Sequence, residues 1–253
     1  MDHIITNSYS LFNVDCLKVM PYIKDKSVDL VLVDPPYNTT PLYWDKSIPF
    51  TELWKEYHRI AKPDAAIAIF AQEPFASFVR MSNLKEYRYD WYWQKERLTN
   101  VFQVKRRPGK TIENICIFYR EQCLYNPQKH EHIGNKVTNK IGDNARWSVT
   151  QSGYNQNTKP LEYIDDGTRH PTQLLRFNRD NVHERLHPTQ KPVALLEYLI
   201  KTYTDEGDVI LDPTMGSGSC GEACLNTGRK FIGIELDTTW FNFAKERIEN
   251  HVQ

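Results

Sequence analysis

The segment Leu211–Asp237 reads LDPTMGSGSCGEACLNTGRKFIGIELD and gives the strongest indication of the fold. Its apolar runs and glycines predict a strand at Val209–Leu211, a loop at Gly216–Ser219, a helix at Cys220–Asn226 and a strand at Lys230–Ile234. A strand, a helix and a second strand in this order form the repeating unit of a parallel sheet whose faces are covered by helices. The segment therefore predicts an α/β protein.

The rest of the chain continues this alternation on both sides of a polar stretch. Apolar runs and period-2 patterns predict further strands, and apolar residues at helical spacing predict further helices. The expected strands are Ser10–Val14, Val28–Val33, Ala65–Phe70, Tyr87–Gln94 and Thr111–Tyr119, and the expected helices are Thr51–Lys62, one starting at Pro192, and Thr239–Asn250. Together these elements predict a doubly wound α/β sheet with helices on both faces.

The polar stretch separates the two ordered parts of the chain. Between Arg120 and Leu186 the sequence is rich in Asn, Gln, Gly, Lys and His and has few apolar runs. A segment of this length is seldom a simple loop in a compact domain. We therefore predict three parts, which are an N-terminal half at 1–120, an inserted subdomain at 121–186 and a C-terminal half at 187–253.

The composition bounds the class of protein. Among the 253 residues, 32 are basic and 32 acidic, so no overall charge indicates a polyanionic partner. Five cysteines without a C-x-x-C pair argue against a disulfide framework and against a zinc cluster, and no metal site is expected. No apolar run is long enough to span a membrane, and the N-terminus lacks the features of a signal peptide. A cytoplasmic location is therefore expected.

The glycine loop indicates a cofactor site. Gly216, Gly218 and Gly221 match G-x-G-x-x-G, and Glu235 follows at the end of the next strand, where an acid binds ribose hydroxyls. This pattern is typical of nicotinamide enzymes, so an oxidoreductase is one hypothesis. Asp212, however, ends the preceding strand, where its charge would repel a pyrophosphate and attract a cation. It favours S-adenosylmethionine, which carries a sulfonium and an ammonium group and no phosphate.

A second motif follows the expected strand Val28–Val33. The stretch Val28–Thr40, VDLVLVDPPYNTT, ends its apolar run with Asp34-Pro35-Pro36-Tyr37. Prolines fix φ and stiffen a turn, which suits a carbonyl group that must face a guest molecule rather than a neighbouring strand. The alternative interpretation is a strand-ending turn in which Tyr37 belongs to the core.

Three motifs together resemble those of the amino-group DNA methyltransferases. Leu211–Asp237 is similar to their cofactor motif, Asp34–Tyr37 to their catalytic motif, and His187–Pro192, HPTQKP, to the segment before their first cofactor helix. Because the catalytic motif precedes the glycine motif, the order resembles the β-class. The resemblance implies a Rossmann-like methyltransferase fold with circularly permuted motif order, in which the first and last strands are neighbours. It also implies S-adenosylmethionine as the cofactor and an insert that recognises the target.

The resemblance assigns residues to the cofactor as well. It implies that Asp15 holds the adenine and Glu235 the ribose, with Thr189 and Lys191 near the methionine end. The full expected set is Asp15, Cys16, Asp34, Thr189, Lys191, Asp212, Thr214, Gly216, Ser217, Gly218 and Glu235. The alternative for Asp15 and Asp212 is that each caps a turn, a common role of a lone Asp after a strand.

The expected catalytic residues are Asp34, Pro35, Pro36 and Tyr37. An exocyclic amine is a poor nucleophile because its lone pair is delocalised into the ring. Hydrogen bonds from its two protons to the Asp34 carboxylate and the Pro35 carbonyl would make the nitrogen more tetrahedral. Tyr37 would stack on a base flipped out of the duplex. The expected reaction is in-line transfer of a methyl group to adenine N6.

Other acceptors of the methyl group are alternatives to adenine N6. Cytosine N4 has the same chemistry, but the enzymes that modify it more often carry Ser where Asp34 stands. Enzymes that act on RNA bases or protein glutamine usually carry Asn there. Cytosine C5 methylation needs a cysteine nucleophile after a proline, and the sequence has no Pro-Cys pair. A DNA-binding module without catalytic activity is an alternative from another class.

Basic residues mark the expected DNA surface. The run Lys95–Lys110, KERLTNVFQVKRRPGK, has six basic residues against one acid. Within it, Lys105, Arg106, Arg107 and Lys110 are the expected phosphate contacts. The polar insert is expected to read base edges in the major groove. The expected partner is double-stranded DNA, while a homodimer and a companion restriction endonuclease are left open.

Overall fold

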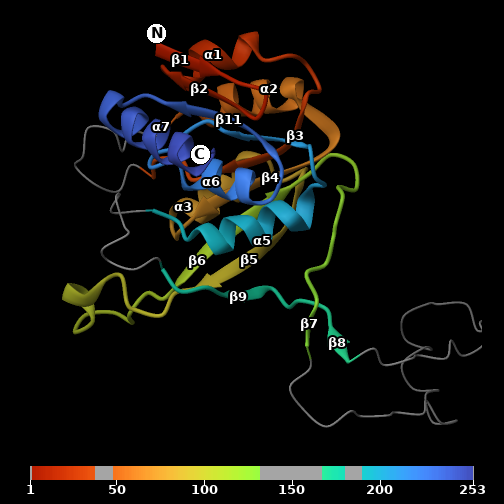
Figure 1. Ribbon diagram of the computed structural model, residues 1–253. Coiled ribbons are helices and arrows are strands. Elements are labelled where there is room, and N and C mark those ends of the chain that lie inside the picture. The colour runs from red at the N-terminus through yellow and green to blue at the C-terminus, as the bar shows by residue number, and fades with distance from the viewer. Residues whose placement is uncertain (1, 38–47, 132–166, 180–189, 253) are drawn as a thin grey trace, which may run out of the picture. The chain divides into compact units, whose positions relative to one another are not determined.

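A computed structural model describes residues 2–37, 48–131, 167–179 and 190–252 (Figure 1). The chain divides into two compact units. The larger unit comprises Met1–Asn126 and Thr172–Gln253, and the smaller one comprises Pro127–Pro171. Within the described residues, no helix combines the length and the apolar character that a membrane crossing requires.

The larger unit is built around a nine-stranded mixed sheet. Its strands are β1 (Asp2–Ile5), β2 (Tyr9–Asn13), β3 (Val28–Val33), β4 (Ala61–Ala71), β5 (Tyr87–Gln94), β6 (Ile112–Phe118), β9 (Leu174–Arg176), β10 (Val209–Asp212) and β11 (Lys230–Glu235). Their spatial order is β1-β2-β11-β10-β3-β4-β6-β5-β9. The strands from β2 to β4 in this order are parallel, whereas β1 and β6 run antiparallel to their neighbours.

Helices cover both faces of this sheet (Figure 1). Those of the larger unit are α1 (Cys16–Val19), η1 (Met20–Tyr22), α2 (Phe50–Ile60), α3 (Phe75–Ser82), η2 (Val101–Gln103), α5 (Val193–Tyr203), α6 (Ser219–Asn226) and α7 (Thr238–Val252). Buried residues of α1, α2 and α3 form one core cluster with the sheet, and those of α5, α6 and α7 form the other. The predicted doubly wound, mixed α/β fold is therefore confirmed.

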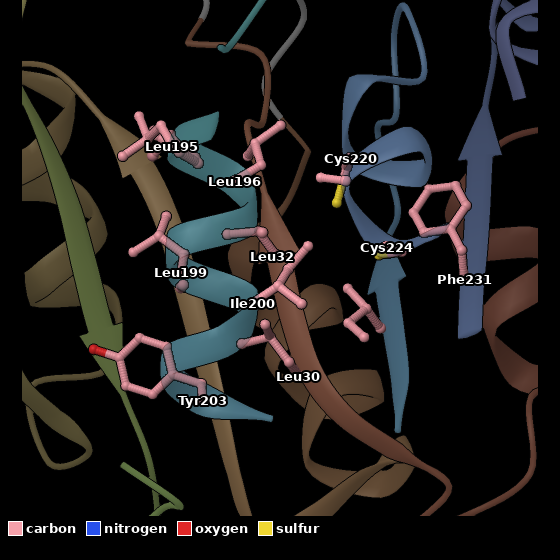
Figure 2. Packing of buried hydrophobic residues seen from close by; sticks show 14 of the residues in the cluster. Leu30, Leu32, Leu195, Leu196, Leu199, Ile200, Tyr203, Cys220, Cys224 and Phe231 are labelled. Carbon is pink, nitrogen blue, oxygen red and sulfur yellow. The ribbon is translucent and has the colours of Figure 1, made fainter. Parts of the chain in front are cut away.

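The strand β3 shows why its sequence is apolar from Leu30 to Val33. Successive side chains of a strand point to opposite faces, and a strand covered on both faces loses the polar positions of an alternating pattern. Leu30 and Leu32 pack on the α5 side (Figure 2), whereas Val31 and Val33 belong to the cluster on the opposite face. All four side chains are buried.

The two ends of the chain meet in the sheet. Strand β2 pairs in parallel with β11, and Asn13 lies opposite Glu235. The Val14 N–H also donates to the Glu235 carbonyl at 3.0 Å. The expected permuted arrangement, with the first and last parallel strands side by side, is therefore found. It brings the segment after β2 next to the end of β11.

The chain around Leu174 differs from the expected three-part division. The separate unit begins at Pro127 and ends at Pro171, so it is shorter at both ends than the predicted insert 121–186. Strand β9 adds to the main sheet beside β5, and Trp93 Nε1–H donates to the Phe177 carbonyl at 2.8 Å. Three residues are too few to show a periodicity, which is why sequence reasoning placed β9 in the insert. In the smaller unit, β7 (His130–Glu131) pairs antiparallel with β8 (Thr168–Arg169).

Candidate active site

A pocket of about 1130 Å³ opens where the carboxyl ends of the parallel strands meet. Ligands of open α/β sheets bind at this edge. The predicted site residues that line the pocket are Asp15, Cys16, Asp34, Pro35, Pro36, Tyr37, Arg107, Lys110, Lys191, Thr214, Gly216 and Glu235. A smaller pocket of about 50 Å³ shares several of them and is lined also by Asp212 and Ser217. The fold thus assembles residues from both ends of the sequence.

Asp34 lies directly after β3, and both oxygens of its carboxylate accept hydrogen bonds. The Tyr37 hydroxyl donates to Oδ1 at 2.8 Å, and the Lys191 ammonium donates to Oδ2. Burial raises the pKa of Asp34 and Lys191 opposes that rise, although 27% of the side chain is still exposed. A carboxylate has about four lone-pair positions, so two acceptor positions are left for a ligand in the pocket.

The residues that follow Asp34 also line the pocket. Within the described residues, no donor bonds to the carbonyl of Pro35. The Tyr37 ring was expected to stack on a substrate base. It stacks on Phe75, with ring centroids 4.8 Å apart and planes inclined by 26°. This contact and the bond to Asp34 hold Tyr37 in place.

The glycine loop joins β10 to α6. Gly216 and Gly218 have φ of +51° and +75°, in the left-handed region that favours glycine. The Gly216 N–H donates to Glu235 Oε2 at 2.9 Å, and the Asp237 N–H donates to Oε1 at 2.8 Å. Both oxygens of Glu235 are therefore fixed at the pocket wall.

Gly218 has a packing role that its sequence motif does not reveal. It lines neither pocket, and its contact with the cofactor stays a prediction. A Cβ at this position would come within 2.9 Å of both Cα and Cβ of Ala244 in α7. A Cβ added at Gly221, the third glycine of the motif, would come within 2.4 Å of Ile248 Cδ1 in α7. These glycines allow α7 to approach the start of α6.

Asp212 is buried at the end of β10, beside the catalytic segment. Its Oδ1 accepts from the Thr214 N–H at 3.0 Å, and the Thr214 hydroxyl donates to the Asp34 carbonyl at 3.1 Å. Burial raises the pKa of Asp212 to about 8, and the Asp34 and Glu235 carboxylates add to the rise. Three carboxyl groups thus gather at this edge, and a cation bound beside them would favour their ionised forms.

Asp15 and Cys16 follow β2 and also line the larger pocket. Asp15 Oδ1 accepts from the Leu17 N–H at 3.0 Å and caps α1. This is the capping role considered as the alternative, and it coexists with a position on the pocket wall. Cys16 is buried, and burial raises the pKa of its thiol to about 12, so the thiol is neutral at ordinary pH.

Lys191 lines the pocket, and its place near the methionine end of the cofactor stays a prediction. Its ammonium binds Asp34 and lies 3.0 Å from Glu113 Oε1. Glu113 Oε2 also forms an ion pair with Lys95 Nζ at 2.5 Å. Sequence reasoning missed Glu113 as a site residue, and it noted Lys95 only as part of the basic run Lys95–Lys110. The pairing of β5 with β6, which brings the two residues together, has no local signal in the sequence.

Comparison with known proteins places this site in a family. A family model described as DNA methylase, for N6 and N4 methyltransferases, matches residues 28–246. The chain belongs to this DNA methylase family. The predicted resemblance to the amino-group DNA methyltransferases is confirmed, and so is the cofactor prediction, because the family is S-adenosylmethionine dependent. Because the chain belongs to a family of methyltransferases, the hypothesis of a nicotinamide-dependent oxidoreductase is rejected in favour of methyl transfer.

Individual relatives of this methylase are distant but extend over nearly all of the chain. It is 27% identical to the Type II methyltransferase M.HpaI of Haemophilus parainfluenzae, over 93% of this chain and 73% of the relative. It is 26% identical to the DNA adenine methyltransferase YhdJ of Escherichia coli, over 95% of this chain and 82% of the relative.

Solved structures support the fold of the methylase. The complex of M1.HpyAVI with S-adenosylmethionine has a TM-score of 0.61 and 24% identity, covering 94% of this chain and 99% of that one. The cytosine-N4-specific PvuII DNA methyltransferase has a TM-score of 0.63 and 16% identity, covering 96% and 91%. Both therefore share the architecture of the larger unit.

The remaining predicted residues of the methylase lie outside the pocket or outside the described chain. Lys105 and Arg106 are exposed and do not line the pocket, whereas Arg107 and Lys110 do. The Lys110 ammonium donates to the Glu73 carbonyl at 3.2 Å. Thr189 and the rest of the segment 187–189 fall outside the described residues.

Proposed function

We propose that this protein transfers a methyl group from S-adenosylmethionine to N6 of adenine in double-stranded DNA. The observation that carries the proposal is the Asp34 carboxylate, held in the pocket beside the acceptor carbonyl of Pro35. The two groups can accept the two protons of an exocyclic amine. Their position at a strand tip, fixed before any ligand enters, is the kind of pre-organised polar site that lowers a barrier.

The chain's own residues fit the cofactor. When bound, S-adenosylmethionine supplies a methyl group activated by the positive charge of its sulfonium. Asp212, Asp34 and Glu235 would provide the opposing negative charge, and Gly216 leaves open space where a side chain would stand. Asp15, which lines the larger pocket with Glu235, would hold the adenine end. These assignments extend the sequence motifs to the geometry of the two pockets, which share several residues.

Adenine N6 is proposed ahead of cytosine N4. The supporting features are the Asp at position 34, where the N4 enzymes more often carry Ser, and the similarity to a relative described as a DNA adenine methyltransferase. Before transfer, the base would leave the duplex and enter the pocket. Asp34 would then accept from the amine while Tyr37, fixed on Phe75, keeps the carboxylate oriented.

The test is methylation of genomic DNA by the purified protein with S-adenosylmethionine carrying a labelled methyl group. We expect label in DNA, recovered after digestion as N6-methyladenine. Modification-sensitive sequencing of the same DNA then gives the recognised sequence. Recovery of label as N4-methylcytosine would replace the proposed base, and absence of label in DNA would contradict the proposal as a whole.

Binding of the cofactor should release a proton from Asp212. Without cofactor, the raised pKa of about 8 keeps this carboxyl protonated at neutral pH. A bound sulfonium favours the ionised form and lowers the pKa, so affinity should rise with pH up to about 8, by at most about tenfold per unit, and level off above it. Isothermal titration calorimetry in buffers of different ionisation enthalpy measures the released proton directly.

The control for this prediction is Asp212→Asn, which preserves size and the acceptor for the Thr214 N–H but cannot ionise. The variant should bind the cofactor more weakly, without proton release and with a flat pH dependence between neutral pH and about 8. Equal proton release by the variant and the wild type would assign the proton to another group.

The exposed basic residues should contribute affinity for DNA without sequence preference. Replacing Lys105 and Arg106 by alanine removes two side chains that are candidates for binding phosphate groups. We expect weaker DNA binding and a slope of log K against log salt that is smaller by about 1 for each side chain that binds a phosphate in the wild type. Fluorescence anisotropy with a labelled duplex over a range of salt concentrations gives the slope.

Lys24→Ala is the matched control for the DNA surface. Lys24 is exposed as well, but it lies before the start of β3, at the edge of the sheet opposite the pocket. Its removal should leave the salt slope unchanged. An equal reduction by both substitutions would mean that Lys105 and Arg106 contribute only to the general charge of the protein.

A further inference from the structure

Four charged side chains that line the pocket form one chain of ion pairs. Lys95 pairs with Glu113 at 2.5 Å, Glu113 pairs with Lys191 at 3.0 Å, and Lys191 pairs with Asp34. Cations and anions alternate along this chain, and its net charge is zero. The side chains of Lys95, Glu113 and Lys191 are only 10%, 5% and 9% exposed.

The sheet topology explains why these residues meet. Strand β6 runs antiparallel to β4, so Glu113 near its start lies at the same edge as Asp34 after β3. Lys95 follows β5 opposite the start of β6, where Trp93 pairs with Glu113. Lys191 reaches the same place from the segment before α5. Four sequence-distant segments therefore supply one cluster.

Stability alone gives little reason for such a cluster. A buried ion pair loses much of its attraction to the cost of desolvation, and replacing it by apolar residues of similar volume is often neutral or stabilising. An aromatic ring lies next to each ammonium group, since the Lys95 ammonium is 4.8 Å from the Trp93 ring centroid and the Lys191 ammonium is 5.1 Å from that of Phe70. The three other residues differ from a purely structural ion pair because they contact Asp34, the proposed catalytic carboxylate, through Lys191.

We propose that Glu113, held by Lys95, is a positioning residue that fixes Lys191 against Asp34 and thereby orients the catalytic carboxylate toward the substrate amine. Lys191 is then a partner of Asp34 more than of the cofactor. The Tyr37 hydroxyl, 2.8 Å from Asp34 Oδ1 and 3.4 Å from Glu113 Oε1, links the two carboxylates a second time. This inference rests on the proposed function, because it assigns Asp34 to the reaction.

Glu113 and Lys191 act in opposite directions on the ionisation of Asp34. The Glu113 carboxylate raises the pKa of Asp34 and the Lys191 ammonium lowers it. Glu113 itself stays ionised, because Lys191 and Lys95 outweigh its burial and lower its pKa. Since only the ionised Asp34 accepts both an amine proton and the Lys191 bond, the acid limb of the pH–rate profile reports this group.

The experiment is single-turnover methyl transfer to genomic DNA as a function of pH, with saturating S-adenosylmethionine. Glu113→Gln is expected to lower the rate constant by on the order of 10²-fold, because the carboxylate of Asp34 loses its fixed orientation. Its acid limb should move to lower pH, whereas that of Lys191→Met should move to higher pH. Glu113→Asp, which keeps the charge, should recover part of the rate and most of the wild-type pH midpoint.

Asp90→Asn is the matched control. Asp90 is a buried carboxylate on β5 that pairs with Arg80 at 2.5 Å and accepts from Asn114, the neighbour of Glu113 on β6. It lines neither pocket. The substitution should lower the melting temperature but leave the pH midpoint of the rate unchanged.

The outcomes separate the two proposals. If the wild type transfers no label to DNA, the proposed function fails. If the wild type is active and the acid limbs of Glu113→Gln and Lys191→Met coincide with that of the wild type, the positioning role is overturned. Equal losses of rate in Glu113→Gln and Asp90→Asn, without a shift of the acid limb, would likewise mean that Glu113 has only a structural role. Circular dichroism of each variant establishes that it is folded.

Discussion

Replacing Asp34 by alanine is expected to lower the rate constant for methyl transfer by on the order of 10³-fold, the range found when one pre-organised hydrogen-bonding group is removed from an active site. The variant loses the acceptor for one amine proton, while the Pro35 carbonyl remains. Lys191 keeps Glu113 as a partner at 3.0 Å, so the buried ammonium is not left alone. Single-turnover transfer of labelled methyl groups to genomic DNA measures the loss of rate.

Two variants complete this test. Asp34→Asn retains the shape of the side chain but can present a donor to the amine, so it should be almost as slow as the alanine variant. Asp64→Ala removes an exposed carboxylate in β4 and should leave the rate within about twofold, as expected for a surface change away from the site. Wild-type rates for Asp34→Ala would falsify the catalytic assignment.

Gly218→Ala is expected to cost about 2–4 kcal/mol in the free energy of unfolding. The strain of an L-residue at a φ of +75° accounts for about 1 kcal/mol. The contact of its Cβ at 2.9 Å with the Cα of Ala244 adds the cost of overpacking, about 1–3 kcal/mol, because the backbone of α7 cannot move aside like the end of a side chain. Urea denaturation measures the difference.

Gly207→Ala separates the two causes. Gly207 also has a positive φ, +86°, but nothing lies within 4 Å of an added Cβ. This variant should lose only about 1 kcal/mol, the part due to backbone strain. Equal destabilisation at both positions would mean that α7 yields to the methyl group and that the close approach at Gly218 is not a constraint.

Much of the fold is readable from local patterns. The strands Val28–Val33 and Tyr87–Gln94 have the predicted bounds, because an apolar run and a period-2 pattern each report which faces of a strand are covered. The motifs at Asp34–Tyr37 and Leu211–Asp237 indicated the same family that the full comparison shows. The short strand Leu174–Arg176 could not be found in this way, because its pairing with β5 is a long-range contact without a local signal.

The residues of the candidate site likewise include some that local patterns predict and some that they do not. Local sequence patterns were enough to predict which residues end the strands, and hence that Asp34, Asp212 and Glu235 lie at one edge of a parallel sheet. That Glu113 and Lys95 join them follows from the folded structure alone, because it depends on β6 running antiparallel beside β4. The reactive groups at a strand end are supplied by residues that are adjacent in the sequence. The charged residues that orient these groups come from other strands, and no local pattern predicts the order of those strands in the sheet.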